Sequence, residues 1–508
     1  METSNKPLNG GQILANALVR QGVDLAFGVP GESFLPLLNG LVDHPEFQFI
    51  TCRQEGGAAY MAEAYGKLTG KPGVLMVTRG PGASNAMVGV HTAYQDSTPM
   101  VLLIGQVGTD MVEREAFQEV DYRRMYSECA KWVGSIDRVD RIDEFVSHAF
   151  HVAQAGRKGP VVLALPEDVL YMTGDEHPLA PAHIVQPGLD INVFDQAMKV
   201  FAGAKRPMII AGGGNWNRAA CDSLSAWANR EGIPVATSFR SQDLLDNLDP
   251  IFAGDLGIGA NPALVKRVQD ADVLLVIGER LGEMTTAGYS VLNVPKTKNT
   301  LIHVHSGSEE LGRVYRPDFA LNCSPENFCA ALAGVKMAGI HTSNDAKTAH
   351  DEYLAFSSPV TVPGDLQLAQ IMSSLPKAIP RDSIVTNGAG NFATWVHRFY
   401  PYGSFKTQLA PANGSMGYGL PAAIAAKIVH PERVAIAVCG DGDFMMNCQE
   451  LATAARYDAF PIVFVVNNSM LGTIRMHQER EFKSRVIATG LTNPDFVKFA
   501  DSFGIPGF

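Results

Sequence analysis

Two apolar runs near the C-terminal end of the chain each finish in a polar side chain suited to bind a cation. VAIAVCGDGDF ends around Asp441, and FPIVFVVNN ends in Asn468. The residues between them, NCQELATAARYD, have helical composition, so the segment predicts a buried strand, a crossover helix and a second buried, parallel strand. Both strand ends then meet at one edge of a sheet. Carboxylate and amide oxygens suit Mg²⁺, which keeps phosphate oxygens in its remaining positions, so we expect a metal-bridged diphosphate.

The glycines on either side of Asp441 support this interpretation. Gly440 and Gly442 would let the backbone come close to a diphosphate, and the start of the following helix favours an anion. A plain turn from strand to helix is the alternative, because short motifs of this kind are weak evidence. The pair Asn467–Asn468 at the end of the second run favours the binding site.

The elements that must position these residues fall into three series. DLAFGVP, FQFITC, GVLMVT and PMVLLIGQV predict buried parallel strands, with helical stretches such as GGAAYMAEAYGKL between them. RPMIIAGGG, IPVATSF, ADVLLVIGER and TLIHVH repeat the pattern, and DSIVTNGAG begins it again. The proline-rich segment 174–188 predicts one linker, and HTSNDAKTAHDEY followed by SSPVTVPGD predicts a second. We therefore predict an α/β protein of three doubly wound, parallel-sheet domains, over residues 1–180, 188–340 and 362–508.

Composition excludes several classes of protein. The net charge of -11 and a pI of about 5.6 argue against nucleic acid or an anionic membrane as main partners. The seven cysteines lack C-x-x-C spacing, which fits a reducing compartment and neither a zinc site nor a disulfide framework. The N-terminus METSNKPLNGG has no basic and apolar leader, and no apolar run reaches membrane-spanning length. We expect a cytoplasmic protein.

The stretch 440–468 resembles the thiamine-diphosphate motif, GDG followed by NN. Four further stretches resemble the large subunit of acetolactate (acetohydroxyacid) synthases: GVDLAFGVPGESFLPLLNGL, RQEGGAAYMAEAYGKLTGKPGV, TRGPGASNAMVGVHTAYQDSTPMVLLIGQV and FQEVD. The resemblance covers nearly the whole chain. It implies thiamine diphosphate and Mg²⁺ as cofactors, and a pyrimidine-binding, a central and a diphosphate-binding domain.

The resemblance also implies a catalytic role for Glu55, in RQEGGAAY. In the family this glutamate bonds N1′ of the cofactor's pyrimidine ring and promotes loss of the proton from C2. The alternative is an ordinary glutamate at a helix start, stabilised by the helix dipole. Because the pyrimidine domain of one subunit faces the diphosphate domain of another in this family, the resemblance implies a homodimer or homotetramer.

Further site residues follow from the same resemblance. Gly440, Asp441, Gly442, Asp443, Asn468, Met416, Gly417 and Met470 would bind the cofactor. Asp441, Asn468 and Met470, the last through a backbone oxygen, would hold the metal. Met416 would lie beneath the bent cofactor, and its alternative is a gap-filling core residue.

Two residues of the FQEVD region, Phe117 and Gln118, match family positions close to the reacting carbon. The resemblance assigns Phe117 to the substrate pocket and Gln118 to catalysis. A core aromatic and a helix cap are the respective alternatives.

The chain departs from the synthases in the substrate pocket. LPEDV has Glu167 where the family carries the lysine of PKD, and LGTIRMHQER puts Thr473 and His477 at the methionine and tryptophan positions. GERLGEMTT and HVHSGSEELGRVY lack the acidic pattern of the flavin-binding members, while the glycines at 212–214 leave FAD open. The ending NPDFVKFADSFGIPGF comes before the last strand and helix expected in the family.

We therefore expect a carboligase or lyase, similar to acetolactate synthase (a transferase). It would decarboxylate a 2-keto acid, with pyruvate as the expected substrate, and pass the acyl group to an acceptor carbonyl. The chain lacks the adjacent His-His pair of many simple 2-keto acid decarboxylases, which favours ligation. A decarboxylase or carboligase with another 2-keto acid is one alternative. A non-catalytic, cofactor-holding or regulatory homologue is another, although such a protein has no use for Glu55.

Overall fold

The computed structural model describes residues 7–181, 183–337, 344–483 and 485–508. The chain divides into two compact units. The first comprises Met1–Val185, Asn413–Leu471 and Glu481–Phe508, and the second comprises Gln186–Ala412 and Gly472–Arg480. The predicted diphosphate-binding segment is thus shared between the two units.

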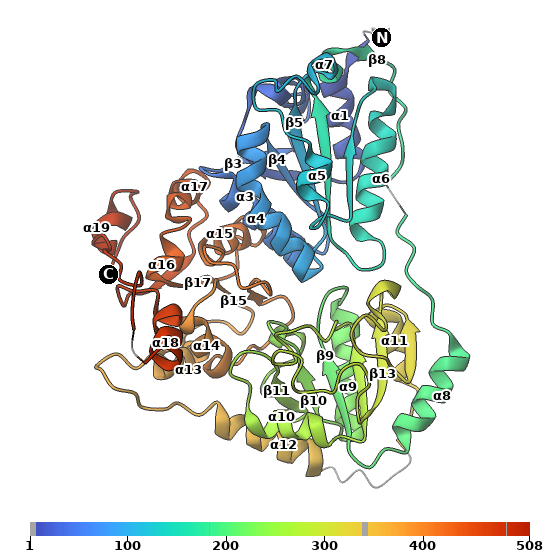
Figure 1. The fold of residues 1–508 in the computed structure, drawn as a ribbon, viewed down its shortest axis with the longest axis vertical. Coiled ribbons are helices and arrows are strands. Elements are labelled where there is room, and N and C mark those ends of the chain that lie inside the picture. Colours follow the sequence, from blue (N-terminus) through green and yellow to red (C-terminus); the bar gives the residue numbers. More distant parts are fainter. Residues whose placement is uncertain (1–6, 182, 338–343, 484) are drawn as a thin grey trace. The chain divides into compact units, whose positions relative to one another are not determined.

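A parallel six-stranded sheet in the order β3-β2-β4-β5-β7-β6 forms the base of the first unit (Figure 1). Its strands are β2 (Leu25–Gly28), β3 (Gln48–Thr51), β4 (Gly73–Val77), β5 (Met100–Gln106), β6 (Trp132–Ser135) and β7 (Pro160–Pro166). A short antiparallel pair, β1 (Leu8–Asn9) and β8 (Thr173–Gly174), adjoins it. The four predicted runs of this region are confirmed as strands, although the edge strand β3 is only partly buried.

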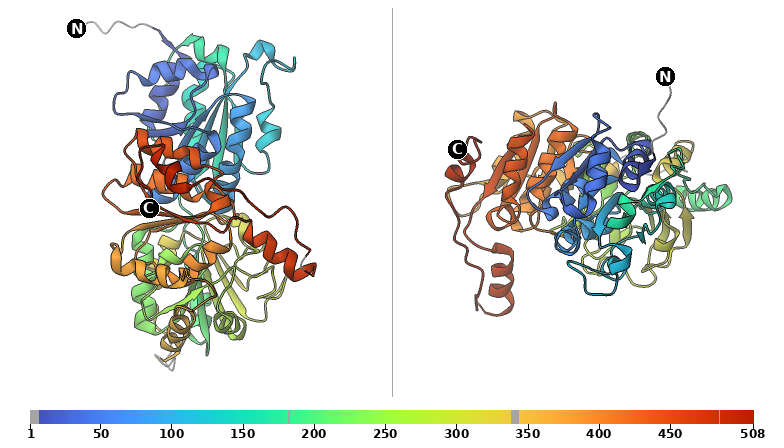
Figure 2. Two further views of the ribbon diagram at one scale, coloured as in Figure 1. Left: turned by 90° about the vertical axis from the view of Figure 1, so that its left-hand side faces the viewer. Right: turned by 90° about the horizontal axis from the view of Figure 1, so that it is seen from above.

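Helices cover both faces of this sheet. They are α1 (Gly10–Arg20), α2 (Leu35–Leu41), α3 (Glu55–Thr69), α4 (Gly80–Asp96), α5 (Tyr122–Tyr126), α6 (Ile142–Gln154) and α7 (Glu167–Tyr171). Apolar side chains of α1 and α6 share one core with alternate strand residues such as Ala26. The next residue, Phe27, points to the other face, where its ring lies 6.5 Å from that of Tyr65 on α3. Figure 2 shows this layering from other directions, and the doubly wound prediction is confirmed.

The C-terminal segments of the first unit contain β17 (Ala435–Gly440) and β18 (Ile462–Val466), which pair in parallel. Their helices are α15 (Gly419–Val429), α16 (Asp441–Phe444), α17 (Leu451–Arg456) and α19 (Phe496–Asp501). The predicted strand, helix and strand are therefore confirmed. One detail was wrong: β18 is not buried, since Ile462 is 49% exposed and the rest of the strand is half-buried.

Helix α3 joins these C-terminal segments to the N-terminal sheet by packing against α15 (Figure 1). The contact contains the fully buried Glu63, whose carboxylate accepts hydrogen bonds from Tyr418 at 2.6 Å and Thr98 at 2.7 Å. Lys67, one turn further along α3, lies 3.3 Å from the same carboxylate. Burial raises the pKa of Glu63, and these donors oppose that rise. A buried carboxyl group thus depends on partners from several segments.

The second unit contains a parallel sheet in the order β11-β10-β9-β12-β13-β14. Its strands are β9 (Pro207–Ala211), β10 (Val235–Thr237), β11 (Phe252–Asp255), β12 (Val273–Ile277), β13 (Thr300–His305) and β14 (Phe319–Asn322). A separate parallel pairing joins β15 (Ile384–Asn387) and β16 (Gln408–Leu409). The helices are α8 (Ile191–Ala202), α9 (Arg218–Glu231), α10 (Pro262–Asp270), α11 (Pro325–Leu332), α12 (Asn344–Phe356), α13 (Leu368–Ala378), α14 (Asn391–Phe399) and α18 (Gly472–Glu481).

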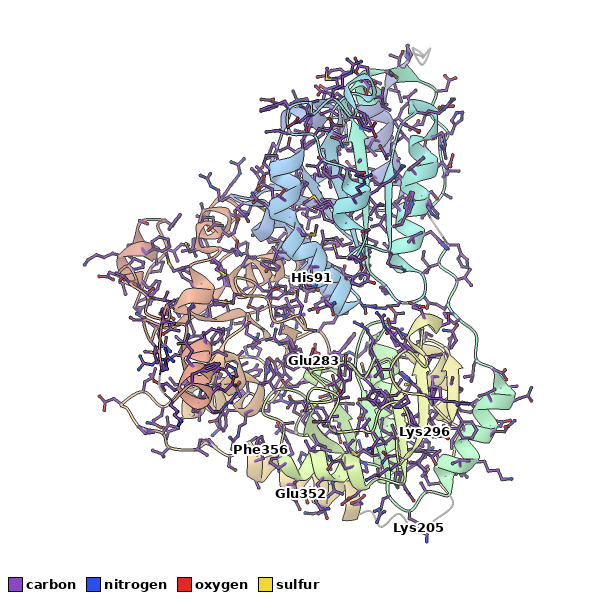
Figure 3. All side chains as sticks on the ribbon, viewed as in Figure 1. His91, Lys205, Glu283, Lys296, Glu352 and Phe356 are labelled. Atoms are coloured by element: carbon purple, nitrogen blue, oxygen red, sulfur yellow. The ribbon has the colours of Figure 1, made fainter. Side chains whose placement is uncertain are left out.

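Most of the polar stretch predicted as the start of a linker is helix α12, and residues 341–343 of it lie outside the described residues. The helix has an apolar face despite its polar composition. Tyr353 packs edge-on against Phe252 of β11, with ring centroids 4.8 Å apart. On the polar side Glu352, labelled in Figure 3, accepts a hydrogen bond from Arg267 at 3.0 Å. The composition of the segment did not predict this apolar face, because few residues of α12 are apolar.

Two other expectations concern the whole chain. All seven cysteines are free thiols, and six of them are buried. Within the described ranges, no helix has both the length and the apolar character needed to cross a membrane.

The contact between α3 and α15 generates a stability prediction. Tyr418→Phe removes the hydroxyl that donates to buried Glu63. A buried acceptor that loses a donor costs about 1–3 kcal/mol, so the free energy of unfolding in urea should fall by about that amount. The control Tyr171→Phe changes a side chain that is 56% exposed, and should stay within about 0.5 kcal/mol of the parent protein. Equal stability of the two variants would contradict the assigned role.

Candidate active site

The predicted metal ligands follow two strands that are paired in register. Gly440 at the end of β17 lies opposite Val466 at the end of β18, so Asp441 and the asparagine pair leave the sheet side by side. Asp441 is only 2% exposed. The side-chain amide of Asn493 donates to Oδ2 of Asp441 at 2.7 Å and to Oδ1 of Asn467 at 2.9 Å. One donor group therefore faces oxygen atoms from both strand ends.

This arrangement fits a hard cation. Carboxylate and amide oxygens are ligands for Mg²⁺. Oδ1 of Asn468 accepts the backbone N–H of Met470 at 3.2 Å, so these residues form one tight turn. Among the described residues there is no group of three or more His, Cys, Asp or Glu side chains placed to hold a metal. A cation at Asp441 would thus rely on amide and backbone oxygens and on phosphate oxygens of its ligand.

The turn around Met416 is fixed by three polar contacts. The N–H of Gly417 donates to Oδ1 of Asp443 at 2.7 Å, and its carbonyl oxygen accepts from Asn447 at 2.8 Å. The carbonyl oxygen of Met416 accepts from the Tyr60 hydroxyl at 3.1 Å. Gly417 has φ +79, and a Cβ there would lie 2.7 Å from the Asn447 side chain, so only glycine suits this position. Met416 itself is half-buried, which does not support the core-residue alternative.

Gly442 has a packing role beside its predicted one. A Cβ at this position would lie 3.0 Å from Leu471 and 3.1 Å from Leu491, which is tighter than ordinary contact. The Met416 methyl group lies within 3.8 Å of the same point. Gly440, Asp441, Gly442, Asp443, Met416 and Gly417 thus belong to one compact region, and their role in cofactor binding stays a prediction.

Glu55 is the first residue of α3 and is half-buried. Its Oε2 accepts a hydrogen bond from the side-chain amide of Asn85 at 2.9 Å. Its Oε1 lies 3.3 Å from the point that a Cβ on Gly82 would occupy. The carboxylate is therefore held against the first two turns of α4. The position at a helix start satisfies both the catalytic interpretation and its alternative, but Asn85 fixes the direction of the side chain.

The backbone that precedes Glu55 is anchored by Glu450, which sequence reasoning missed. Its carboxylate accepts the N–H groups of Gln54 at 3.0 Å and Arg53 at 3.2 Å. Glu450 is fully buried, and burial raises its pKa. A Cβ on Gly57 would lie 2.7 Å from this carboxylate, so the glycine makes room for it. Glu450 stands inside the motif GDGDFMMNCQEL, but its partners are nearly 400 residues away.

Phe117 and Gln118 lie in the loop before α5. Gln118 has φ +65, and its carbonyl oxygen accepts the N–H of Gly80, the first residue of α4, at 3.0 Å. Gln118 therefore does contact a helix start, through its backbone. Phe117 is 75% exposed, so the core-aromatic alternative is wrong. The start of α4 thus brings the loop of Gln118 and the carboxylate of Glu55 to one region.

Thr473 and His477 lie on α18, which belongs to the second unit. The hydroxyl of Thr473 donates to Oδ1 of Asn391, the first residue of α14, at 3.0 Å. Arg480 donates to Nδ1 of His477 at 2.7 Å. Both residues thus contact other residues of the second unit. Their place in a substrate pocket stays a prediction.

Comparison with known proteins identifies the family of the chain. The N-terminal TPP binding domain of thiamine pyrophosphate enzymes matches residues 8–125, the central domain 194–332 and the C-terminal TPP binding domain 388–508. The chain is 30% identical over 506 residues to the acetolactate synthase isozyme 2 large subunit of Escherichia coli (strain K12), covering 98% of this chain and 90% of that protein. It is 30% identical over 527 residues to a probable acetolactate synthase large subunit of Methanococcus aeolicus, covering 98% and 87%.

The mitochondrial acetolactate synthase catalytic subunit of Saccharomyces cerevisiae is 29% identical over 543 residues, covering 100% of this chain and 77% of the relative. The chain belongs to the thiamine pyrophosphate (thiamine diphosphate) enzymes. Within that class it is similar along nearly its whole length to acetolactate synthase large subunits, and the resemblance stated from its sequence is confirmed.

The first prediction for this site concerns its cation. Asp441→Ala should abolish thiamine diphosphate binding at micromolar concentrations, because the diphosphate is held through the metal. Calorimetry with Mg²⁺ and then with EDTA measures this dependence. The control Asp222→Ala, at a side chain that is 66% exposed on α9, should bind as the parent protein does. Equal affinity of the parent protein in EDTA would refute the metal bridge.

A second prediction concerns the flavin. At the carboxyl edge of the central sheet, a Cβ on Gly213 would lie 2.1 Å from the carbonyl oxygen of Gly278, and one on Gly212 would lie 1.8 Å from the hydroxyl of Ser238. The nearby Glu279 is itself buried and accepts the N–H of Leu281 at 3.0 Å. These glycines pack protein against protein, which accounts for them without a nucleotide.

We therefore expect the purified protein to be colourless, or to carry FAD well below one equivalent. Absorbance near ~450 nm, the usual flavin band, measures occupancy. A sample incubated with excess FAD and passed through gel filtration controls for loss during purification. A stoichiometric flavin spectrum in that sample would overturn the expectation.

Proposed function

We propose that this protein is a thiamine-diphosphate-dependent enzyme that decarboxylates a 2-keto acid and transfers the acyl group to an acceptor carbonyl. Pyruvate is the 2-keto acid that we expect. The relatives named acetolactate synthase support this activity. The single observation that carries it is the Glu55 carboxylate, which Asn85 holds at the start of α3. When bound, the cofactor supplies a carbon nucleophile that attacks the keto group and takes up the electrons released on decarboxylation.

The residues of this chain would bind and activate that cofactor. Asp441, Asn468 and the backbone of Met470 would hold Mg²⁺ and, through it, the diphosphate. Met416, on its clamped turn, would support the rings, and Asp443 would keep that turn in place through Gly417. Glu55 would share a proton with N1′ of the pyrimidine ring. From the family resemblance we further propose a homodimer or homotetramer. The free cysteines fit a reducing compartment, and we propose the cytoplasm.

A second candidate is a decarboxylase or carboligase for another 2-keto acid. The observation in its favour is Glu167, which forms an ion pair with Arg79 where the synthases carry a lysine. A glutamate at the position of that lysine would change the charge that the substrate meets. Mass spectrometry of the products from pyruvate alone, and then from a panel of 2-keto acids, tests both candidates. An acyl-transfer product from pyruvate supports the first, and an aldehyde product from another acid supports the second.

The role of Glu55 is tested by Glu55→Gln, which keeps the size of the side chain but removes its acidic proton. General acid–base contributions are typically about 10²–10⁴-fold, so we expect turnover to fall by that order. Affinity for the cofactor should change little, because the anchoring diphosphate lies elsewhere. Hydrogen–deuterium exchange at C2 of the bound cofactor should slow in parallel.

The matched control is Glu32→Gln, which changes an exposed glutamate at another helix start in the same unit. It should leave turnover and exchange unchanged. If Glu55→Gln behaves like this control, Glu55 is only a helix-start residue and the catalytic proposal fails.

A further inference from the structure

A charged pair, Arg79 and Glu167, stands beside the start of α4, and Arg79 has no role assigned so far. Arg79 immediately precedes this helix, and its side chain is 16% exposed. Its Nη2 bonds Oε2 of Glu167 at the start of α7, and its Nη1 donates to the carbonyl oxygen of Phe117 at 3.4 Å. Three segments that are far apart in the sequence thus meet at one guanidinium group.

Two donors of this cluster have no acceptor among the residues that the structure describes. One is Nε of Arg79, and the other is the hydroxyl of Tyr122, whose side chain is 2% exposed. Val120, two residues before Tyr122, lies 3.0 Å from the point that a Cβ on Gly80 would occupy, so the segment of Tyr122 packs against the residue that follows Arg79. Burial raises the pKa of Tyr122, and the charge of Arg79 opposes that rise. Buried donors cost free energy when they are not bonded, so two neighbouring donors at one place indicate an acceptor that arrives with a ligand.

The cluster lies next to the residues assigned to chemistry. Gly82 follows Arg79 by three residues, about one helical turn, and a Cβ on it would lie 3.3 Å from Oε1 of Glu55. Gln118, next to Phe117, bonds Gly80. A ligand bound by Arg79 would therefore lie near the start of α4, which both Glu55 and Gln118 contact.

Charge decides what kind of ligand fits. Arg79 and Glu167 together are neutral, and Glu167 contacts only Nη2 of the guanidinium. Nε–H remains as a second N–H of the same planar fork, a geometry that matches a carboxylate. The resemblance to the synthases implies a lysine at the position of Glu167. In this chain residue 167 is the anion of the pair, and the positive charge belongs to Arg79.

We propose that Arg79, through Nε, and the Tyr122 hydroxyl bind the carboxylate group of the 2-keto acid substrate, while Glu167 orients the guanidinium through Nη2. This assignment rests on the proposed function, because it takes a 2-keto acid as the substrate class. Glu167 also lowers the net positive charge that the carboxylate meets. It therefore limits affinity while it fixes geometry.

The test uses oxamate, an unreactive isostere of pyruvate that keeps the carboxylate, with the protein loaded with thiamine diphosphate and Mg²⁺. Calorimetry should show that Arg79→Gln weakens oxamate binding at least ~10-fold, because a charge-assisted bond is lost. Tyr122→Phe should weaken it by a smaller factor, of about 3–10-fold. Glu167→Gln keeps an acceptor for Nη2 but removes the competing charge, so binding should tighten several-fold.

The matched control is Arg138→Gln, which removes a 63% exposed arginine that is also paired with an aspartate in the same unit. Its oxamate affinity should equal that of the parent protein. With pyruvate, Arg79→Gln should raise KM by the same factor as its loss of oxamate affinity and leave kcat within about three-fold. Thermal melting of each variant identifies a folding defect, and Tyr122→Phe supplies a variant that keeps the charge pair.

The outcomes separate this inference from the proposed function. If no acyl-transfer product forms but oxamate binding depends on Arg79 and Tyr122, the proposed function fails and the carboxylate site stands. If product forms while Arg79→Gln and Tyr122→Phe bind oxamate within two-fold of the parent protein, the carboxylate site is overturned. Absence of oxamate binding by the parent protein would overturn it as well.

Discussion

The position of α3 is the constraint on which the candidate site depends. This helix begins with Glu55, and hydrogen bonds at two places along it connect it to the C-terminal segments. Near its start, Glu450 accepts the backbone N–H groups of Arg53 and Gln54. Two turns further along, Glu63 accepts the hydroxyl of Tyr418. Both carboxyl groups are fully buried, so each would be costly without its donors, and that cost fixes where the helix lies.

The same helix also contacts the turn around Met416 within one chain. Tyr60 lies on α3 between Glu55 and Glu63. Its hydroxyl donates to the carbonyl oxygen of Met416, the residue expected beneath the cofactor. A shift of α3 would therefore move Glu55 and the Met416 turn together. Small and aromatic side chains on α3 allow this close approach, as Gly57 does beside Glu450.

The sequence predicts those parts of the molecule whose information is local. Apolar runs locate the strands, and GDG with the asparagine pair locates the edge where Asp441 emerges, because parallel strands in register bring their carboxyl ends together. Contacts between distant residues leave no such pattern. Nothing in NCQEL indicates that Glu450 bonds Arg53, and nothing near NPDF indicates that Asn493 reaches both Asp441 and Asn467. The exposure of β18 and the apolar face of α12 were likewise missed, since burial depends on which neighbours a segment meets.

The residues that depart from the synthases bear on whether the chain is an enzyme at all. A homologue that had lost its chemistry would be free to accumulate substitutions without compensating partners. Each of the three departures at the substrate-pocket positions has a polar partner: Glu167 with Arg79, Thr473 with Asn391, and His477 with Arg480. Glu55 meanwhile keeps a carboxylate that a mere cofactor binder would not need, and Asn85 directs it. Compensated substitutions beside a retained carboxylate favour a change of substrate over a loss of catalysis.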